Sequence, residues 1–201
     1  IITLEIYESD IESLIKRNKL LELQKNSKIK KEIFARDTAV AIALQKTIID
    51  YSLKKVLTFH SSIKKAENFS KVNEALPRIY PNFKPIPQFH VSGKTPTRQR
   101  ADAMLNFQNS SKGIITNARC LTEGVDMPSI DCVVFCDPKK SRVDIVQATG
   151  RALRLSKKTN KKFGYIFVPT IINDQEDFVK EMEKNPYEEI VKILGTLSFH
   201  D

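Results

Sequence analysis

The stretch from Ile115 to Arg154 decides the fold, and three segments within it carry most of the information. They are Leu121-Thr-Glu-Gly-Val-Asp-Met-Pro128, then Cys132-Val-Val-Phe-Cys-Asp137, then Gln147-Ala-Thr-Gly-Arg-Ala-Leu-Arg154. The middle segment is an apolar run of the kind found in strands that are buried on both faces of a parallel sheet. The last segment follows a helical period, so a strand is succeeded by a helix, as in an α/β fold.

The third segment predicts a helix with two different faces. At 3.6 residues per turn, one face collects Gln147, Gly150, Arg151 and Arg154. The other face collects apolar and small residues: Ile145, Val146, Ala148, Thr149, Ala152 and Leu153. Arginines fixed on the edge of a buried helix can neutralise charge on a phosphate during phosphoryl transfer. For this segment taken alone, a solvated basic edge is the alternative interpretation.

Outward from this stretch, short apolar runs alternate with helical patterns. Strands are predicted at 56–59, 86–91, 113–116, 132–136 and 164–168. One helix is expected over 62–76, closed by Pro77, and another over about 96–107, with Thr95 as its N-cap. Ser141 and Asp144 form a capping-box pattern at the start of the helix that carries Arg151. The alternation predicts a mostly parallel central sheet flanked by helices.

The two ends of the chain differ from the middle. Residues 1–50 are expected to be a helical extension packing on the core, with an apolar stripe at Val40, Leu44, Ile48 and Tyr51. Residues 51–172 are expected to form the α/β domain, and residues 173–201 a tail of short helices split at Pro186. Because the chain starts with Ile1 rather than Met, we expect it to be part of a longer protein.

Composition limits the classes of partner and location. A net charge of +9 and a pI near 9.4 favour polyanionic partners. No stretch approaches the roughly 20 apolar residues of a membrane span. The three cysteines lack the second Cys or His pair that a metal site requires, so we expect no metal site. Buried thiols in a reducing, cytoplasmic compartment are predicted instead, with Cys132 and Cys136 on one face of their strand.

Taken together, the motifs resemble those of the C-terminal RecA-like domain of superfamily 2 (DEAD/DEAH-like) helicases and translocases. Residues 121–128 look like motif V, residues 147–154 like motif VI, and residues 56–63 like motif IV. His90-Val-Ser-Gly93, with Arg100 and Phe107, resembles the next family block. The amino-acid sequence around residues 117–128 is similar to that of helicase-like subunits of bacterial restriction and other DNA-processing systems.

The resemblance implies a role for each motif. Arg151 and Arg154 would act as arginine fingers toward the γ-phosphate of ATP, and Gln147 would position the same network. Glu123, Gly124 and Asp126 would lie at the edge of the nucleotide site, although an Asp in a turn before Pro is also common. Ser61, Ser62, Ser92 and Gly93 would grip the sugar-phosphate backbone of nucleic acid, and ordinary N-capping is the alternative for them. Many relatives carry Thr where this chain has Ala118, and Thr116 and Asn117 are the candidates to replace it.

The resemblance also implies that the motor has a second RecA-like domain, which carries the phosphate-binding loop. No Gly-x-x-x-x-Gly-Lys-Ser/Thr loop occurs in the sequence, so ATP with Mg²⁺ would be bound mainly by an upstream RecA-like domain. The chain alone is expected to be inactive. The favoured function is the second motor domain of an ATP-dependent DNA helicase or translocase. An RNA helicase domain and a non-enzymatic nucleic-acid-binding adaptor with the same fold are the alternatives. A Rossmann enzyme is disfavoured, since no Gly-x-Gly-x-x-Gly follows the first strand.

Overall fold

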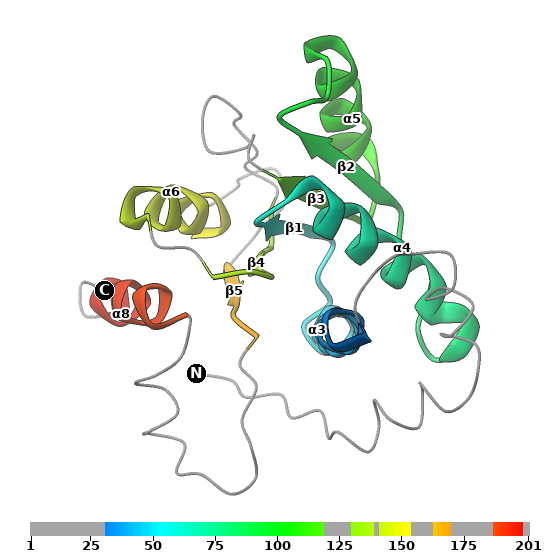
Figure 1. Ribbon diagram of the computed structural model, residues 1–201, viewed down its shortest axis with the longest axis horizontal. Helices are drawn as coiled ribbons and strands as arrows, with labels where there is room; N and C mark the ends of the chain where they lie inside the picture. The colour runs from blue at the N-terminus through cyan, green and yellow to red at the C-terminus, as the bar shows by residue number, and fades with distance from the viewer. Residues whose placement is uncertain (1–30, 119–129, 139–140, 154–162, 170–186, 199–201) are drawn as a thin grey trace, which may run out of the picture.

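The computed structural model describes residues 31–118, 130–138, 141–153, 163–169 and 187–198. Helices and strands alternate along these residues, as Figure 1 shows. In chain order they are α3 (Lys31–Asp50), β1 (Lys55–His60), α4 (Ile63–Ile79), β2 (Gln88–Ser92), α5 (Thr97–Asn109), β3 (Gly113–Ala118), β4 (Cys132–Phe135), α6 (Arg142–Leu153), β5 (Tyr165–Phe167) and α8 (Glu188–Ser198).

The described strands form one five-stranded sheet in the order β2-β3-β1-β4-β5. Every pairing is parallel, which confirms the predicted α/β class. β1 lies at the centre, with Val56 opposite Ile114 of β3 and opposite Cys132 of β4. Because all strands run the same way, their carboxyl ends meet at one edge of the sheet, which is where open α/β sheets bind ligands.

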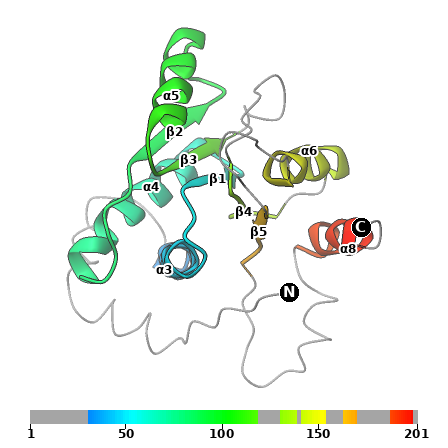
Figure 2. The same ribbon diagram turned by 180° about the vertical axis from the view of Figure 1, so that it is seen from behind.

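Two apolar layers cover the sheet, one on each face. Side chains of α3 and α4 pack on one face, among them Leu44 and Phe69, together with Val134 of β4. Side chains of α5, α6 and α8 pack on the other face, among them Phe107 and Ile145. Figures 1 and 2 show α3 and α4 on one side of the strands and α6 and α8 on the other. The sheet is therefore buried on both faces, as its continuous apolar strands predict.

The predicted stripe on α3 is confirmed, because Val40, Leu44 and Ile48 are buried in the first of these layers. The predicted burial of the cysteines on one face of their strand is also confirmed for the two that are described. Cys132 and Cys136 lie in the same apolar layer, and both are buried free thiols. The predictions for residues 1–30, for Cys120 and for a break at Pro186 lie outside the described residues. None of the described helices is both long and apolar enough to cross a bilayer.

Two predicted helix ends are wrong. Pro77 does not close α4, which continues to Ile79. Proline there removes only one donor in the last turn, and the Tyr80 amide still bonds the Leu76 carbonyl at 2.8 Å. Thr95 is not the N-cap of α5, because Pro96 holds that position without a side-chain hydrogen bond. The Thr95 hydroxyl is engaged elsewhere, accepting from the Ser92 amide at 3.0 Å.

Strand β2 starts two residues later than predicted, at Gln88 instead of Ile86. Pro87 has no amide hydrogen, so it cannot donate to a neighbouring strand. Its carbonyl still accepts from the Ile114 amide at 3.0 Å. The other four strands agree with their predicted positions to within one or two residues at each end.

Candidate nucleotide and nucleic-acid site

Helix α6 is positioned by its first turn and by its buried face. The hydroxyl of Ser141 accepts from the Asp144 amide at 3.3 Å, which confirms that Ser141 caps the helix. Ile145, Ala148 and Thr149 are buried against the sheet. The Thr149 hydroxyl donates to the Ile145 carbonyl at 2.7 Å, so a buried polar group is satisfied inside the helix.

The opposite face of α6 is exposed, as predicted for Gln147 and Gly150. The prediction is wrong for Val146, which was assigned to the apolar face but is 46% exposed. Val143 is exposed as well. Arg151 lies in α6, one turn after Gln147. Its side chain is not among those that the structure describes. Arg154 follows the last residue of the helix and lies outside the described residues.

Gly150 lies on the exposed face of α6, with open space around it among the described residues. A Cβ added there would meet no heavy atom within 4 Å among the described residues. Glycine inside a helix costs about 0.5–1 kcal/mol relative to alanine, so a packing constraint would normally be needed to explain it. The structure shows no such constraint within the described residues. A bare patch of backbone therefore lies on the exposed face of α6, next to the position of Arg151.

Glu123, Gly124 and Asp126, the three residues predicted at the nucleotide edge, lie outside the described residues. Their roles stay predictions. The strand before them ends at Ala118, at the carboxyl edge of the sheet next to β1.

Ser62, Ser92 and Gly93 lie at the carboxyl edge as predicted, and each makes a hydrogen bond there. Ser62 is the N-cap of α4, and its side chain accepts from the Lys65 amide at 3.3 Å. Ser92 ends β2, and its hydroxyl lies 3.1 Å from that of Thr95. The Gly93 amide donates to the Ala118 carbonyl at 3.2 Å. These contacts fix the loops. They occupy the amide of Gly93, which is its only donor, so phosphate binding at these loops would have to use the donors of Ser62 and Ser92 that these bonds leave open.

Thr116 and Asn117 are placed differently from the serines. Both are buried within β3. The Thr116 hydroxyl lies 2.9 Å from His90 Nδ1 and donates to the Phe89 carbonyl at 3.3 Å. The structure therefore does not bring Thr116 to the surface. Ser92 is buried as well, with 4% of it exposed, whereas Ser62 is half-buried.

Ser61 differs from all of these because its donors point into the protein. Its amide and its hydroxyl both donate to Asp137 Oδ2, at 2.9 and 3.1 Å. Lys65 of α4 forms an ion pair with the other oxygen of that carboxylate, and an Arg36 nitrogen of α3 lies 4.0 Å from the same atom. Asp137 is 5% exposed.

Sequence reasoning did not assign a role to this cluster of Asp137, Lys65 and Arg36. The available signal was an aspartate directly after a buried apolar strand, at the carboxyl edge of a parallel sheet. The partners could not be found that way, because Ser61 and Asp137 are 76 positions apart.

Two carboxyl groups in this region have opposite pKa shifts. Burial on its own would raise the pKa of Asp137, but hydrogen bonds from Lys65 and Ser61 outweigh burial and the net pKa is lowered. The pKa of Asp37 is raised to about 6, first by burial and then by the nearby Asp137 charge. Burial also lowers the pKa of His60, the last residue of β1, to about 4. Asp137 is thus ionised and His60 neutral at pH 7.

Comparison with known proteins places this arrangement in a family. The sequence matches the helicase conserved C-terminal domain over residues 16–156, well over half of the chain. The chain belongs to that family. Its parallel sheet is that of the C-terminal RecA-like domains found in superfamily 2 helicases.

Relatives of this chain are much longer than it is. A Saccharomyces cerevisiae protein with the provisional name ATP-dependent helicase IRC3 is 29% identical over 118 residues, which are 54% of this chain and 17% of that protein. The ATP-dependent RNA helicase has1 of Schizosaccharomyces pombe is 26% identical over 113 residues, 56% of this chain and 18% of that protein. The chain therefore spans under a fifth of the length of these two relatives.

Solved structures share the fold. The ATP-dependent type ISP restriction-modification enzyme LlaBIII bound to DNA is 26% identical, with a TM-score of 0.65, over 80% of this chain and 12% of that one. Domain 2 of the DEAD-box helicase Mss116p bound to an RNA duplex is 16% identical, with a TM-score of 0.52, over 68% of this chain and 50% of that one. The second likeness concerns the fold alone.

Proposed function

We propose that this chain is the second motor domain of an ATP-dependent DNA helicase or translocase. In this proposal it supplies arginine fingers to ATP held mainly by a preceding RecA-like domain, and it grips the nucleic-acid backbone. The observation that carries the proposal is the exposed face of α6, where Gln147 and Gly150 are open on a helix whose other face is buried.

The argument from α6 is geometric. Ile145, Ala148 and Thr149 fix the rotation of the helix about its axis, so the exposed face has a defined direction. The open backbone at Gly150 allows a second body to approach closely. A neighbouring domain that carries a nucleotide fits this surface, and Arg151 would then stabilise negative charge on the γ-phosphate. Arg154 would act beside it, and Glu123, Gly124 and Asp126 would complete the edge of the site.

ATP with Mg²⁺ is the proposed cofactor, and when bound it supplies the phosphoryl group whose transfer drives the motor. The residues of α6 that would face it, Gln147 and Arg151, are polar or cationic, which suits the outer side of a triphosphate. The metal would then be held by the preceding domain.

The argument for nucleic acid rests on the carboxyl edge. In the first turns of α4 and α5 there is no acidic residue, although acidic residues are favoured at helix N-termini. Lys64, Lys65, Arg98 and Arg100 occupy these turns instead. Basic residues there cost helix stability, and a polyanion bound at the edge offsets that cost. Ser62, Ser92 and Gly93 lie between these two helix starts and the sheet.

DNA is favoured over RNA by one comparison. The chain is more similar in sequence and in fold to the DNA-bound type ISP enzyme than to the RNA-bound DEAD-box domain. An RNA helicase is the second candidate, favoured by the relative that is named an RNA helicase. Because backbone contacts read phosphates more than bases, the contacts at this edge do not by themselves separate the two.

The test uses the full-length protein that contains this domain. Arg151→Ala should reduce nucleic-acid-stimulated ATP turnover by about 10³-fold or more, the typical effect of removing an arginine finger. Nucleic-acid binding should stay near that of the unchanged protein. ATP turnover is measured by phosphate release, and binding by fluorescence anisotropy with single-stranded DNA and RNA of the same sequence.

Arg78→Ala is the matched control. Arg78 is an exposed arginine in the last turn of α4, at the end of the sheet opposite the carboxyl edge. Its removal should leave turnover within about twofold, as expected for a surface position. Equal turnover by the Arg151→Ala and Arg78→Ala proteins would refute the finger assignment. Tighter binding of RNA than DNA would favour the second candidate.

A further inference from the structure

The centre of the sheet contains a junction between the strands β1 and β4. β1 and β4 are adjacent strands, but the chain leaves them in opposite directions. After β1 it enters α4, which packs with α3 on one face, and after β4 it enters α6 on the other face. Strand ends that diverge in this way define the switch point of an open α/β sheet. Figures 1 and 2 show α4 and α6 on opposite sides of β1 and β4.

One carboxylate connects the two diverging segments. Ser61 is the first residue after β1, and Asp137 lies two residues after β4. The amide and hydroxyl of Ser61 donate to Asp137 Oδ2, while Lys65 of α4 pairs with Oδ1. The start of α4 is therefore attached to the segment that leads into α6 through a single side chain.

Two observations indicate that this is a permanent attachment and not a phosphate site temporarily filled by a carboxylate. Asp137 is 5% exposed, so a phosphate could not reach the Ser61 donors without displacing a buried side chain. The bonds from Lys65 and Ser61 also outweigh burial and lower its pKa, which keeps the carboxylate charged at neutral pH. Charged hydrogen bonds of this kind are among the stronger ones in proteins.

We propose that Asp137 is a positioning residue that holds the start of α4 on the nucleic-acid edge and couples it to α6. The proposal rests on the proposed function, because it assigns nucleic acid to the α4 side of the junction and the nucleotide to the α6 side. Through Ser61 and Lys65, the carboxylate sets where Ser62 and Lys64 lie. We then expect a displacement of α4 or of α6 to displace the segment that contains Asp137 as well.

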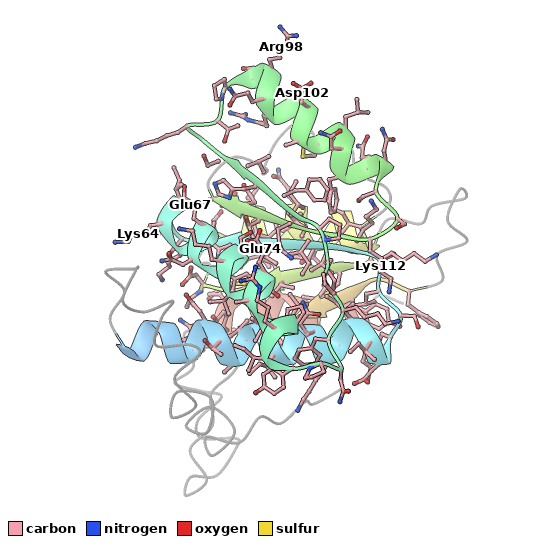
Figure 3. The ribbon with its side chains drawn as sticks, turned by 90° about the vertical axis from the view of Figure 1, so that its right-hand side faces the viewer. Lys64, Glu67, Glu74, Arg98, Asp102 and Lys112 are labelled. Atoms are coloured by element: carbon pink, nitrogen blue, oxygen red, sulfur yellow. The ribbon has the colours of Figure 1, made fainter. Side chains whose placement is uncertain are left out.

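The sign of one effect separates positioning from simple electrostatics. Asp137→Asn removes a negative charge from a protein that binds a polyanion, so charge alone predicts tighter binding. Loss of positioning predicts weaker binding. The matched control is Glu67→Gln on α4, which removes the same charge from an exposed side chain near Lys64, as Figure 3 shows.

The experiment measures binding of the full-length protein to labelled single-stranded DNA, with and without a non-hydrolysable ATP analogue. Asp137→Asn should weaken binding by about two- to thirtyfold, the range seen for residues that transmit coupling. It should also reduce the factor by which the ATP analogue changes DNA affinity. Ser61→Ala, which removes one of the donors from an exposed residue, should shift both quantities in the same direction by a smaller factor. Glu67→Gln should bind as tightly as the unchanged protein or more tightly.

The outcomes separate this inference from the proposed function. If the unchanged protein binds DNA and hydrolyses ATP, but Asp137→Asn behaves like Glu67→Gln, the positioning role is overturned and the motor function stands. If the unchanged protein binds neither DNA nor RNA, the proposed function itself fails. Thermal unfolding shows whether each variant is folded at the assay temperature. If Asp137→Asn is not, Ser61→Ala decides, and an unchanged DNA affinity and ATP coupling in that variant overturn the inference.

Discussion

The buried carboxyl of Asp37 predicts an unusual dependence of stability on pH. Asp37 lies on α3, and its Oδ2 atom is buried without a hydrogen-bond partner in the described part of the chain. Burial, and then the Asp137 charge, raise its pKa from 3.8 to about 6. We therefore expect Asp37→Asn to remove a pH-dependent cost that the folded protein bears at neutral pH.

The magnitude follows from the shift. A raised pKa of about two units corresponds to about 3 kcal/mol, at about 1.36 kcal/mol per unit. Above pH 6, Asp37 is ionised in both the folded and unfolded states, and the folded state bears the full cost. Between pH 6 and about 4, the folded state takes up the proton before the unfolded state does. The contribution of Asp37 to stability therefore increases as the pH falls through this window.

His60 acts in the opposite direction over nearly the same window. Burial lowers its pKa from 6.5 to about 4, so the unfolded state takes up a proton first as the pH falls. This shift of about 2.5 units makes the folded protein about 3 kcal/mol less stable at pH 4 than at pH 7. The contributions of Asp37 and His60 to the pH dependence of stability largely cancel in the unchanged protein. In Asp37→Asn, only the contribution of His60 remains.

The assay is urea unfolding of residues 1–201, followed by circular dichroism between pH 4.5 and 7.5. The free energy of unfolding of Asp37→Asn should fall by about 2–3 kcal/mol on going from pH 7 to 4.5, while the unchanged protein changes much less. Asp102→Asn is the matched control, because Asp102 is an exposed acid on α5 that Figure 3 shows at the molecular surface. If the difference between Asp37→Asn and the unchanged protein is the same at every pH, the reasoning is refuted.

Two further predictions concern the packing around α5. The Lys55 ammonium donates to the Phe107 and Ser110 carbonyls at the end of that helix. Lys55→Met should therefore reduce the free energy of unfolding by about 2–4 kcal/mol, measured by urea denaturation. A loss below about 0.5 kcal/mol would contradict the capping role. A Cβ on Gly113 would lie 2.9 Å from a Phe89 ring carbon and 3.1 Å from Phe107, so Gly113→Ala should cost about 1–3 kcal/mol, measured in the same way, and an unchanged stability would show that the rings yield freely.

Much of the fold could be predicted because its signals are local. The apolar runs at 56–59 and 132–136 predict buried strands, and the Ser141 cap and periodic apolar residues predict α6. The errors occurred where local signals competed. Pro77 lies in the last turn of α4, where it removes only one hydrogen bond, so the helix tolerates it. Val146 is exposed because the buried face of α6 is narrower than the apolar pattern indicated.

The site was predictable only in part. The exposed position of Gln147 and Gly150 follows from helical spacing, and the structure confirms it. The roles of Arg151, Arg154 and residues 123–126 stay predictions. Burial of Thr116 and Asn117 could not be predicted from their spacing, because it depends on β2 and β1 lying on either side of β3.

The amino-acid sequence by itself determined the class of the protein, its alternating strands and helices, and the helix that carries Gln147 and Arg151. These properties depend on residues a few positions apart, whose period fixes which side of an element is apolar. Only the tertiary structure decided the strand order and the junction between Ser61, Lys65 and Asp137. A parallel sheet pairs strands that are distant in the chain, and no local pattern specifies which strand ends become neighbours.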